Sequence, residues 1–349
     1  MAGPSPAPPS PPEELASRLL DALQRRIPGA HGVRNLARLS GGASQETFAF
    51  EAETDRGPLP LVLRRSPGGA PRQGGMGSTL SLEDEARVVA RAAAAGVPVP
   101  SILFVLEPAD GLGSGFVMRF LEGESLPRRI LRDEALARLR QGLAAECGRI
   151  LARIHATDVR GIAGLESVPP ELAVERCRKL LRAFDVPRPV VELALVWLED
   201  HLPSPVPQTL VHGDFRNGNL LVGPEGVRAV LDWELAHVGD PAEDLGWLCA
   251  NVWRFGERDR RVGGFGDLPD LLAAYEEAGG RPIPPERVHW FEVLAGVKWT
   301  LGCSTMAAAF AAGSDRNVER AAVGRRASEN EIDLLHLLDP APPGTAGGP

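Results

Sequence analysis

The feature that most constrains this chain is a short polar segment between two apolar, strand-like runs. The segment reads His-Gly-Asp-Phe-Arg-Asn-Gly-Asn from His212 to Asn219, and a further short apolar run ends at Asp232. A loop held between two strands places Asp214 and Asn219 on one rim, because the strands fix both of its ends. The turn after the next strand brings Asp232 to the same rim. The chain must therefore fold so that two carboxylates and an amide converge.

These residue types at this spacing are typical of phosphoryl transfer. The reaction needs a carboxylate that orients the attacking hydroxyl, ligands for Mg²⁺ and a cation that stabilises the transferring group. Asp214 is the candidate catalytic carboxylate and Arg216 the candidate cation. Asn219 and Asp232 are the candidate Mg²⁺ ligands. Each residue alone has a structural interpretation, since an Asp after a strand often caps a helix or forms a turn, but the ordered set favours catalysis. His212 is interpreted as a structural residue of the loop.

With these residues the chain resembles the aminoglycoside phosphotransferase family, which has a His-Gly-Asp catalytic loop. The resemblance covers about residues 36–312. The run from Val211 to Cys249 is similar to one subgroup in particular, the phosphotransferase domain found fused to, or encoded near, some acyl-CoA dehydrogenases. Further matches to that subgroup occur at Gly263–Gly266, Trp290–Val293 and Lys298–Trp299.

The resemblance implies an α+β, two-lobed fold like that of protein kinases, with a small antiparallel-sheet lobe before a larger helical lobe. ATP and Mg²⁺ are the implied cofactors, and a small molecule with a hydroxyl group is the implied substrate. Strand-like patterns lie at residues 36–39, 47–52, 59–63, 102–106 and 115–120. The predicted divisions are a disordered leader (1–12), an N-terminal helix (13–29), the small lobe (30–120), a hinge (121–123), the helical lobe (124–338) and a disordered tail (339–349).

A glycine pair between the first two strands is the predicted phosphate cover. Glycine lets a backbone approach a ligand closely, so the N–H groups of Gly41, Gly42 and Ser44 are expected to face the phosphates. The family usually has a lysine on the third strand, where this chain has Arg64, which keeps the charge but changes its geometry. Glu85, in the following helical run, is the expected partner of Arg64. The alternatives are an ordinary hairpin turn and solvated charges at a strand end.

The last strand of the small lobe leads into the hinge. The resemblance implies that backbone groups near Met118 and Phe120 hydrogen-bond the adenine of ATP. Beyond the hinge, Asp240, Pro241 and Glu243 predict a helix start with a cap, a proline in the first turn and a returning carboxylate.

The acceptor is less constrained by the sequence. Five cations fall in the part of the helical lobe where acceptors bind in this family: Arg254, Arg258, Arg260, Arg261 and Lys298. They favour an anionic or neutral acceptor over a polycation, because a desolvated ligand must meet opposite charge. Their alternative interpretation is a solvated face balanced by Glu257, Asp259 and Asp267.

The subgroup resemblance implies a hydroxyacyl-CoA thioester as acceptor and a functional link to an acyl-CoA dehydrogenase. The alternative acceptors are an antibiotic, either aminoglycoside or macrolide, and an amino alcohol. Two other classes remain open: a nucleotide-binding pseudokinase or scaffold, which only Arg64 suggests, and a helical interaction protein that binds no nucleotide.

Composition narrows the possible partners and the compartment. A net charge of −8 argues against a nucleic-acid partner, because phosphate backbones select basic surfaces. No run was expected to reach the roughly 18 apolar residues that cross a bilayer, so no membrane contact is predicted. The four cysteines are widely spaced and predict reduced thiols, as in a cytoplasm.

Overall fold

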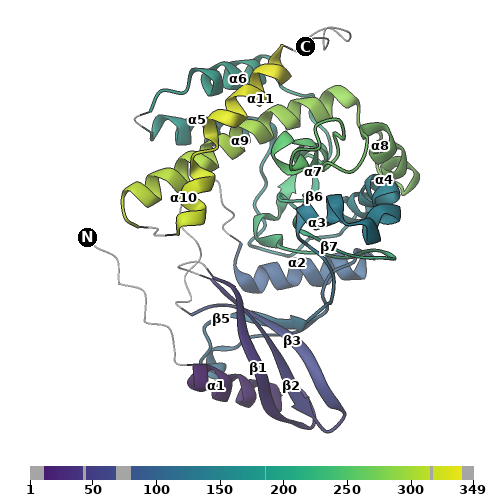
Figure 1. Ribbon diagram of the computed structural model, residues 1–349, viewed down its shortest axis with the longest axis vertical. Coiled ribbons are helices and arrows are strands. Elements are labelled where there is room, and N and C mark those ends of the chain that lie inside the picture. Colours follow the sequence, from purple (N-terminus) through teal and green to yellow (C-terminus); the bar gives the residue numbers. More distant parts are fainter. Residues whose placement is uncertain (1–11, 42–44, 68–79, 185, 315–316, 340–349) are drawn as a thin grey trace.

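The protein consists of two lobes joined by a short connection. A computed structural model describes residues 12–41, 45–67, 80–184, 186–314 and 317–339. A strand-rich lobe and a helix-rich lobe lie at opposite ends of the molecule (Figure 1). The predicted two-lobed α+β fold is therefore confirmed. The predicted leader and tail fall almost entirely outside the described residues.

The small lobe is built on one antiparallel sheet. Its strands are β1 (Ala30–Gly41), β2 (Glu46–Thr54), β3 (Gly57–Ser66), β4 (Ile102–Val105) and β5 (Ser114–Arg119). Neighbouring strands pair in the order β1-β2-β3-β5-β4, and each pairing is antiparallel. Strand β1 begins before the predicted residue 36, because an edge strand is paired on one side only and tolerates the polar residues of its first half.

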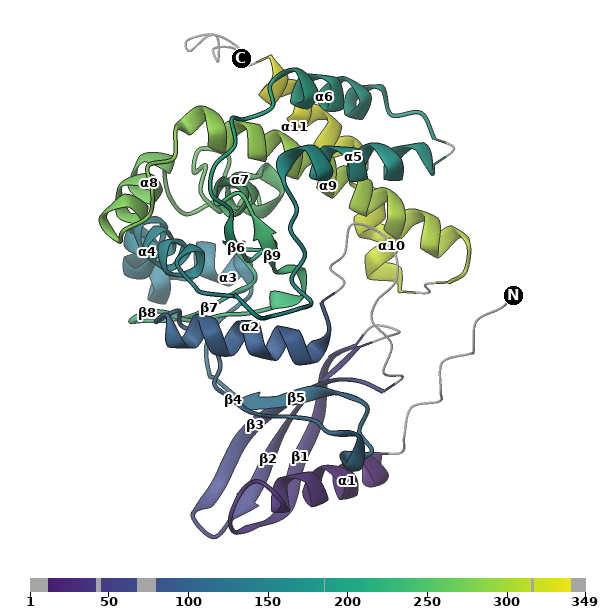
Figure 2. The same cartoon turned by 180° about the vertical axis from the view of Figure 1, so that it is seen from behind.

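Two helices flank this sheet. Helix α1 (Pro12–Gln24) lies across one face, and Leu15, Leu19 and Leu23 at helical spacing pack with Phe50 and Leu61 of the strands (Figure 2). Each buried leucine stabilises the lobe by roughly 1.5–3 kcal/mol. Helix α2 (Leu82–Ala94) lies between the sheet and the helical lobe in both views. The lobe junction is thus formed around α2 and the sheet edge.

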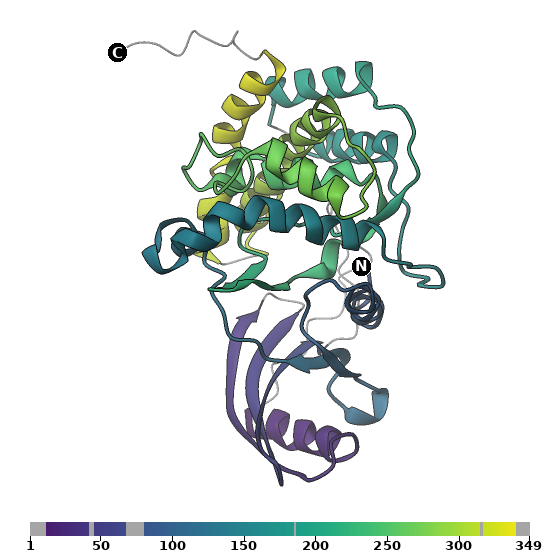
Figure 3. The ribbon, with the colours of Figure 1, turned by 90° about the vertical axis from the view of Figure 1, so that its right-hand side faces the viewer.

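The helical lobe surrounds two short β-pairs. Its helices are α3 (Pro127–Arg132), α4 (Ala137–His155), α5 (Pro170–Arg182), α6 (Pro189–Asp200), α7 (Ala242–Cys249), α8 (Leu268–Glu277), α9 (Pro285–Ala311), α10 (Val318–Gly324) and α11 (Ala327–Leu338). Its 3₁₀ turns are η2 (Glu134–Leu136), η3 (Trp233–Leu235) and η4 (Asn251–Arg254), and η1 (Pro108–Asp110) belongs to the small lobe. Strand β6 (Thr209–Val211) pairs with β9 (His237–Gly239), and β7 (Leu220–Gly223) pairs with β8 (Gly226–Val230). The β7–β8 hairpin faces the small lobe (Figures 2 and 3).

Helix α9 departs from the sequence-based expectation about apolar length. Over Pro285–Ala311 it is long and apolar enough to cross a membrane by length and composition alone. In the fold, 44% of the apolar stretch of this helix is buried, and the helix packs against α5, α6, α7, α10 and α11. The expectation that no run reaches spanning length is wrong for this helix, because a long core helix needs apolar residues on several faces.

Helix α7 begins differently from the prediction. Asp240 accepts a hydrogen bond from the Ala242 N–H at 3.0 Å, but Glu243 does not return to the helix start. Its carboxylate instead contacts Lys298 Nζ at 2.8 Å and His237 Nε2 at 3.1 Å. The predicted capping box is therefore wrong in its second half, because two groups of the lobe interior take up the Glu243 charge.

Candidate active site

The polar loop between β6 and β7 has the course that its flanking strands predict. Gly213 has a φ of 80°, and a Cβ there would lie 2.4 Å from the Leu235 carbonyl oxygen, so only glycine fits. Buried Asp244 of α7 accepts the N–H groups of His212 at 2.8 Å and Gly213 at 2.9 Å. His155 Nε2 lies 3.2 Å from the same Asp244 carboxylate. The start of the loop is thus fixed to the helical lobe.

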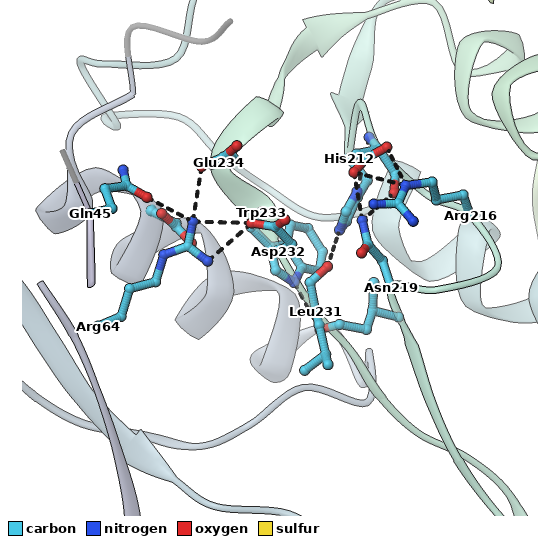
Figure 4. Close-up of polar contacts among 12 residues, drawn as sticks. Gln45, Arg64, His212, Arg216, Asn219, Leu231, Asp232, Trp233 and Glu234 are labelled. Atoms are coloured by element: carbon cyan, nitrogen blue, oxygen red, sulfur yellow. Dashed lines mark hydrogen bonds and ion pairs between the residues drawn. The ribbon is translucent and has the colours of Figure 1, made fainter. Parts of the chain in front are cut away.

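Both ring nitrogens of His212 are used inside the loop. Its Nε2 lies 3.1 Å from the Leu231 carbonyl oxygen, and its Nδ1 accepts the Asp214 N–H at 3.2 Å (Figure 4). Burial lowers the pKa of His212, so the ring is neutral at pH 7. This geometry supports the structural interpretation of His212, since neither nitrogen is left to act as a base.

Three donors converge on the carboxylate of Asp214. Asn219 Nδ2 lies 2.6 Å from Oδ2, and Arg216 Nε lies 3.0 Å from Oδ1 and 3.2 Å from Oδ2. The third donor is Trp247 Nε1 of α7, at 2.8 Å from Oδ1. Burial raises the pKa of Asp214, and the Arg216 charge partly offsets this. A carboxylate with a raised pKa is better matched to accepting a proton near neutral pH.

The two predicted metal ligands lie beside each other. The Leu231 N–H donates to the Asn219 carbonyl oxygen at 2.8 Å, which places Asp232 next to that loop residue. Asp232 has a left-handed backbone, with φ 65° and ψ 67°, and its side chain is 36% exposed. Asn219 uses its Nδ2 as a donor to the Asp214 carbonyl oxygen at 2.9 Å, so its Oδ1 is the atom offered to a metal.

Asn219 and Asp232 offer the kind of oxygen ligands that Mg²⁺ takes, but they are too few to hold the ion by themselves. Mg²⁺ takes oxygen ligands and is usually held by one or two carboxylates together with phosphate and water oxygens. In the described part of the chain, no three His, Cys, Asp or Glu side chains form a group that could hold a metal ion by themselves. Asn219 and Asp232 would therefore hold the ion together with the phosphates of a nucleotide.

Arg64 lies at the centre of an acidic group at the lobe junction. Its Nη1 and Nη2 each lie 3.0 Å from Asp232 Oδ1, and Nη2 lies 3.1 Å from Glu234 Oε2 and 3.3 Å from Gln45 Oε1 (Figure 4). Its Nε lies 3.5 Å from Glu85 Oε1, so the predicted Arg64–Glu85 pair is present. Burial by itself would lower the pKa of Arg64, but its three carboxylate neighbours raise it, and the guanidinium stays charged.

The acidic group around Arg64 predicts a pH effect on stability. Burial raises the pKa of Glu85 from 4.5 to about 7, although Arg64 acts in the opposite direction. Stability from such a group is present below pH 4.5 and is lost as pH rises through 7. We expect the unfolding free energy of the wild type, relative to that of Glu85→Gln, to fall over this range by at most about 3–4 kcal/mol, at ~1.4 kcal/mol per pKa unit, and the melting temperature to fall with it. Parallel melting profiles for the two proteins would contradict the shifted pKa.

The remaining predicted nucleotide contacts are only partly described. Gly41 ends β1, opposite Glu46 of β2, while Gly42 and Ser44 lie outside the described residues. Met118 lies in β5 between strands β3 and β4. Phe120 donates its N–H to the Pro60 carbonyl oxygen at 3.1 Å, so this donor is already used within the small lobe.

The basic residues predicted to face the acceptor are mostly paired. Arg254 Nη2 lies 2.7 Å and Arg261 Nη2 lies 2.5 Å from the carboxylate of buried Glu292. Arg260 pairs with Asp267 at 2.7 Å, and Lys298 pairs with Glu243 at 2.8 Å. Four of the five cations are therefore paired with carboxylates, and of these only Arg260 has a partner that the alternative interpretation named. The preference for an anionic or neutral acceptor stays a prediction. Sequence could not show that Glu292 of α9 reaches two arginines distant from it in the chain.

Two tryptophans beside the loop were not anticipated as site residues. Trp247 contacts Asp214 as described above, and the Arg216 guanidinium lies 4.4 Å from the ring centre of Trp253. The only sequence signal was spacing, because Trp247 follows Asp244 by one helical turn and so shares a face with it. The sequence pattern of α7 and η4 did not show that Trp247 contacts Asp214 or that Trp253 contacts Arg216.

Comparison with known proteins identifies the family to which the chain belongs. A family model described as "Phosphotransferase enzyme family" matches residues 35–287. "Acyl-CoA dehydrogenase family member 10" of Mus musculus is 33% identical over 245 residues, which cover 66% of this chain and 22% of that protein. The chain spans about a fifth to a third of the length of the curated acyl-CoA dehydrogenase relatives that it matches.

Solved structures share the fold. A putative aminoglycoside phosphotransferase from Ralstonia eutropha has a TM-score of 0.71 at 23% identity, with 92% of this chain and 98% of that chain covered. A thermostable aminoglycoside phosphotransferase APH(4)-Ia, in ternary complex with AMP-PNP and hygromycin B, has a TM-score of 0.58 at 19% identity, with coverage of 93% and 99%. At these identities the likeness shows the two-lobed fold.

Proposed function

The chain belongs to the phosphotransferase enzyme family; from this premise we propose that it transfers the γ-phosphoryl group of ATP to an alcohol group in the presence of Mg²⁺. The observation that carries the proposal is the partly buried Asp214 carboxylate, with Asn219 and Arg216 both within hydrogen-bond distance of it. An ATP analogue bound to a relative of the same fold supports ATP as the donor.

The proposed chemistry divides the work among four side chains. Asp214 accepts a hydrogen bond from the substrate hydroxyl and takes its proton late in the transfer. Arg216 stabilises charge on the transferring phosphoryl group, and Asn219 and Asp232 hold Mg²⁺, which neutralises the triphosphate. Catalysis then comes mainly from positioning and electrostatics, because the phosphoryl group itself needs little covalent assistance.

On the nucleotide side, we assign the phosphates to Arg64. Its guanidinium carries a charge beside Asp232, and Glu85 lies 3.5 Å from its Nε as an ion-pair partner without a hydrogen bond to that atom. Arginine therefore takes the position of the usual lysine, with a planar group that reaches several oxygens at once. The assignments of Gly41, Gly42 and Ser44 as phosphate cover and of the hinge near Met118 and Phe120 as adenine site remain parts of the proposal.

For the acceptor, we propose a hydroxyacyl-CoA thioester whose hydroxyl is phosphorylated, with a functional link to an acyl-CoA dehydrogenase. The support is the likeness to a protein named acyl-CoA dehydrogenase family member 10. An antibiotic is the second candidate, because relatives of this fold are aminoglycoside phosphotransferases and because four of the five cations are already neutralised. An amino alcohol is the third. The pseudokinase or scaffold alternative is opposed by the intact Asp214, Asn219 and Asp232.

The function is tested by mass spectrometry of phosphate transfer. Mg²⁺-ATP is offered with a panel of hydroxyacyl-CoA thioesters, aminoglycosides, macrolides and amino alcohols, and Asp214→Asn serves as the inactive control. A phosphorylated thioester formed only by the wild type is the expected result. A phosphorylated antibiotic would replace the thioester proposal, and ATP binding without any transfer would favour the scaffold.

The compartment proposed for this reaction is the cytoplasm. Cys147, Cys177, Cys249 and Cys303 are all free and buried. Burial raises the pKa of Cys147 well above its ordinary value and the pKa of Cys177 and Cys249 to about 12, so these thiols stay protonated and unreactive. Free thiols of this kind suit a reducing compartment.

A further inference from the structure

We propose that Trp247 is a positioning residue, whose indole N–H holds the carboxylate of Asp214 in its working orientation throughout the catalytic cycle. The inference rests on the proposed function, because it concerns the carboxylate that is assigned to orient the acceptor hydroxyl. Its basis is one contact between helix α7 and the catalytic loop, in which Trp247 Nε1 lies 2.8 Å from Asp214 Oδ1.

Trp247 differs in kind from the other two donors to this carboxylate. Arg216 is assigned to the transferring phosphoryl group, so it has a second partner once a nucleotide binds, and Asn219 Nδ2 donates to the other carboxylate oxygen, Oδ2. The indole has one donor and no acceptor, and its donor is directed at Asp214. Trp247 is therefore the donor that can hold Oδ1 whether or not a nucleotide is bound.

The position of Trp247 is set by packing on three sides. Its side chain is buried, its ring centre lies 5.5 Å from that of Trp253, and Lys298 Nζ lies 5.5 Å from its ring centre. A Cβ on the preceding Gly246 would lie 2.5 Å from Phe291 Cβ, so glycine allows α7 to approach α9 closely at this point. The indole is thus held by a close helix contact rather than by its own rotamer alone.

Helix α7 holds the loop at two consecutive points. Asp244 binds the backbone N–H groups of His212 and Gly213, and Trp247, one turn later on the same face, binds the side chain of Asp214. The backbone contacts place the loop, and the indole contact fixes the rotation of the carboxylate about its own bonds. A small rotation of the base away from the hydroxyl is costly, because misplacement by about 1 Å can slow a reaction by 10²-fold.

The test compares Trp247→Phe with a matched control, Trp290→Phe. Trp290 is equally buried and also donates its indole N–H, but to the Leu198 carbonyl oxygen at 3.2 Å, away from the site. Both substitutions remove one buried indole hydrogen bond and keep an aromatic ring, so they have similar costs in stability. The acceptor-independent probe is hydrolysis of Mg²⁺-ATP, with water taking the place of the acceptor hydroxyl.

For Trp247→Phe we expect kcat to fall by about 10- to 100-fold with the KM for ATP nearly unchanged, because the lost contact positions the base and does not bind nucleotide. Trp290→Phe should keep both constants. Wild-type kcat in Trp247→Phe, or a parallel change of kcat and KM in both variants, would overturn the inference. Failure of the proposed function looks different, since the wild type itself would then not hydrolyse ATP, whether or not it binds the nucleotide.

A second measurement does not depend on activity or on a folded Trp247 variant. With ¹⁵N-labelled tryptophan, the indole N–H signal of Trp247 should move on Asp214→Asn, because the acceptor changes from a carboxylate to a neutral amide. The signal of Trp290 should stay in place. If the Trp247 signal did not move, Asp214 would not be its partner in solution and the proposal would fail.

Discussion

Replacing Asp214 with asparagine is expected to slow phosphoryl transfer by about 10²- to 10⁴-fold, the range that a positioned acid or base contributes. Asparagine has nearly the same shape but cannot take the proton of the acceptor hydroxyl. Its NH₂ group would also face donors, because Asn219, Arg216 and Trp247 all direct N–H groups at this side chain. Nucleotide affinity should change little, since Asp214 is not assigned to the triphosphate.

This expectation is checked by two assays on the same protein. Transfer is measured by mass spectrometry with the acceptor found in the panel, and ATP affinity is measured by calorimetric titration with Mg²⁺ present. Asp267→Asn is a suitable control, because Asp267 forms an exposed pair with Arg260 that contributes little to stability. Wild-type transfer by Asp214→Asn would remove this residue from the role of base.

The second large effect is expected for Asp232→Asn, which should weaken ATP binding only when Mg²⁺ is present. The carboxylate is assigned to the ion, and it also accepts two hydrogen bonds from Arg64. We expect the Kd for ATP with Mg²⁺ to rise by about tenfold or more, as one lost charge-assisted ligand contributes on the order of 1.5–3 kcal/mol. The Kd measured in EDTA should change much less.

Glu234→Gln is the control that distinguishes the loss of a Mg²⁺ ligand from a change in the surroundings of Arg64. Glu234 is another carboxylate partner of Arg64, at 3.1 Å, but it is not assigned to Mg²⁺. Its replacement should alter the surroundings of Arg64 and leave the ratio of the two Kd values, with Mg²⁺ and with EDTA, as in the wild type. The same ratio in Asp232→Asn would exclude Asp232 from the metal site.

Predictions from sequence succeeded for site residues that lie close together in the chain. His212 to Asn219 form one loop, and the short hairpin that follows returns the chain to Asp232, so few folds could separate these residues. Arg64 and Glu85 were also paired correctly, because a strand end and the start of the next helix commonly meet in this kind of lobe. The roles assigned to the site residues stay predictions.

Predictions failed where a charge had several possible partners. Glu243 was expected to cap its own helix, but it is bound by Lys298 and His237. The solvated-face interpretation assigned Glu257, Asp259 and Asp267 as the balancing acids, but Arg254 and Arg261 share Glu292 of α9. A charged side chain pairs with whichever opposite charge the packing brings near, and this choice depends on residues far away in the chain.

The sequence by itself determined the catalytic loop and the residue types available for phosphoryl transfer, because these depend on spacing within a few turns of chain. The two-lobed class of fold followed from the resemblance of that loop to a known family. Only the tertiary structure decided what those residues touch. It brought Arg64 onto Asp232 across 168 positions and the indole of Trp247 onto Asp214 across 33. Such contacts arise when separate elements pack together, and the periodicity of one element does not specify which face of another it will meet.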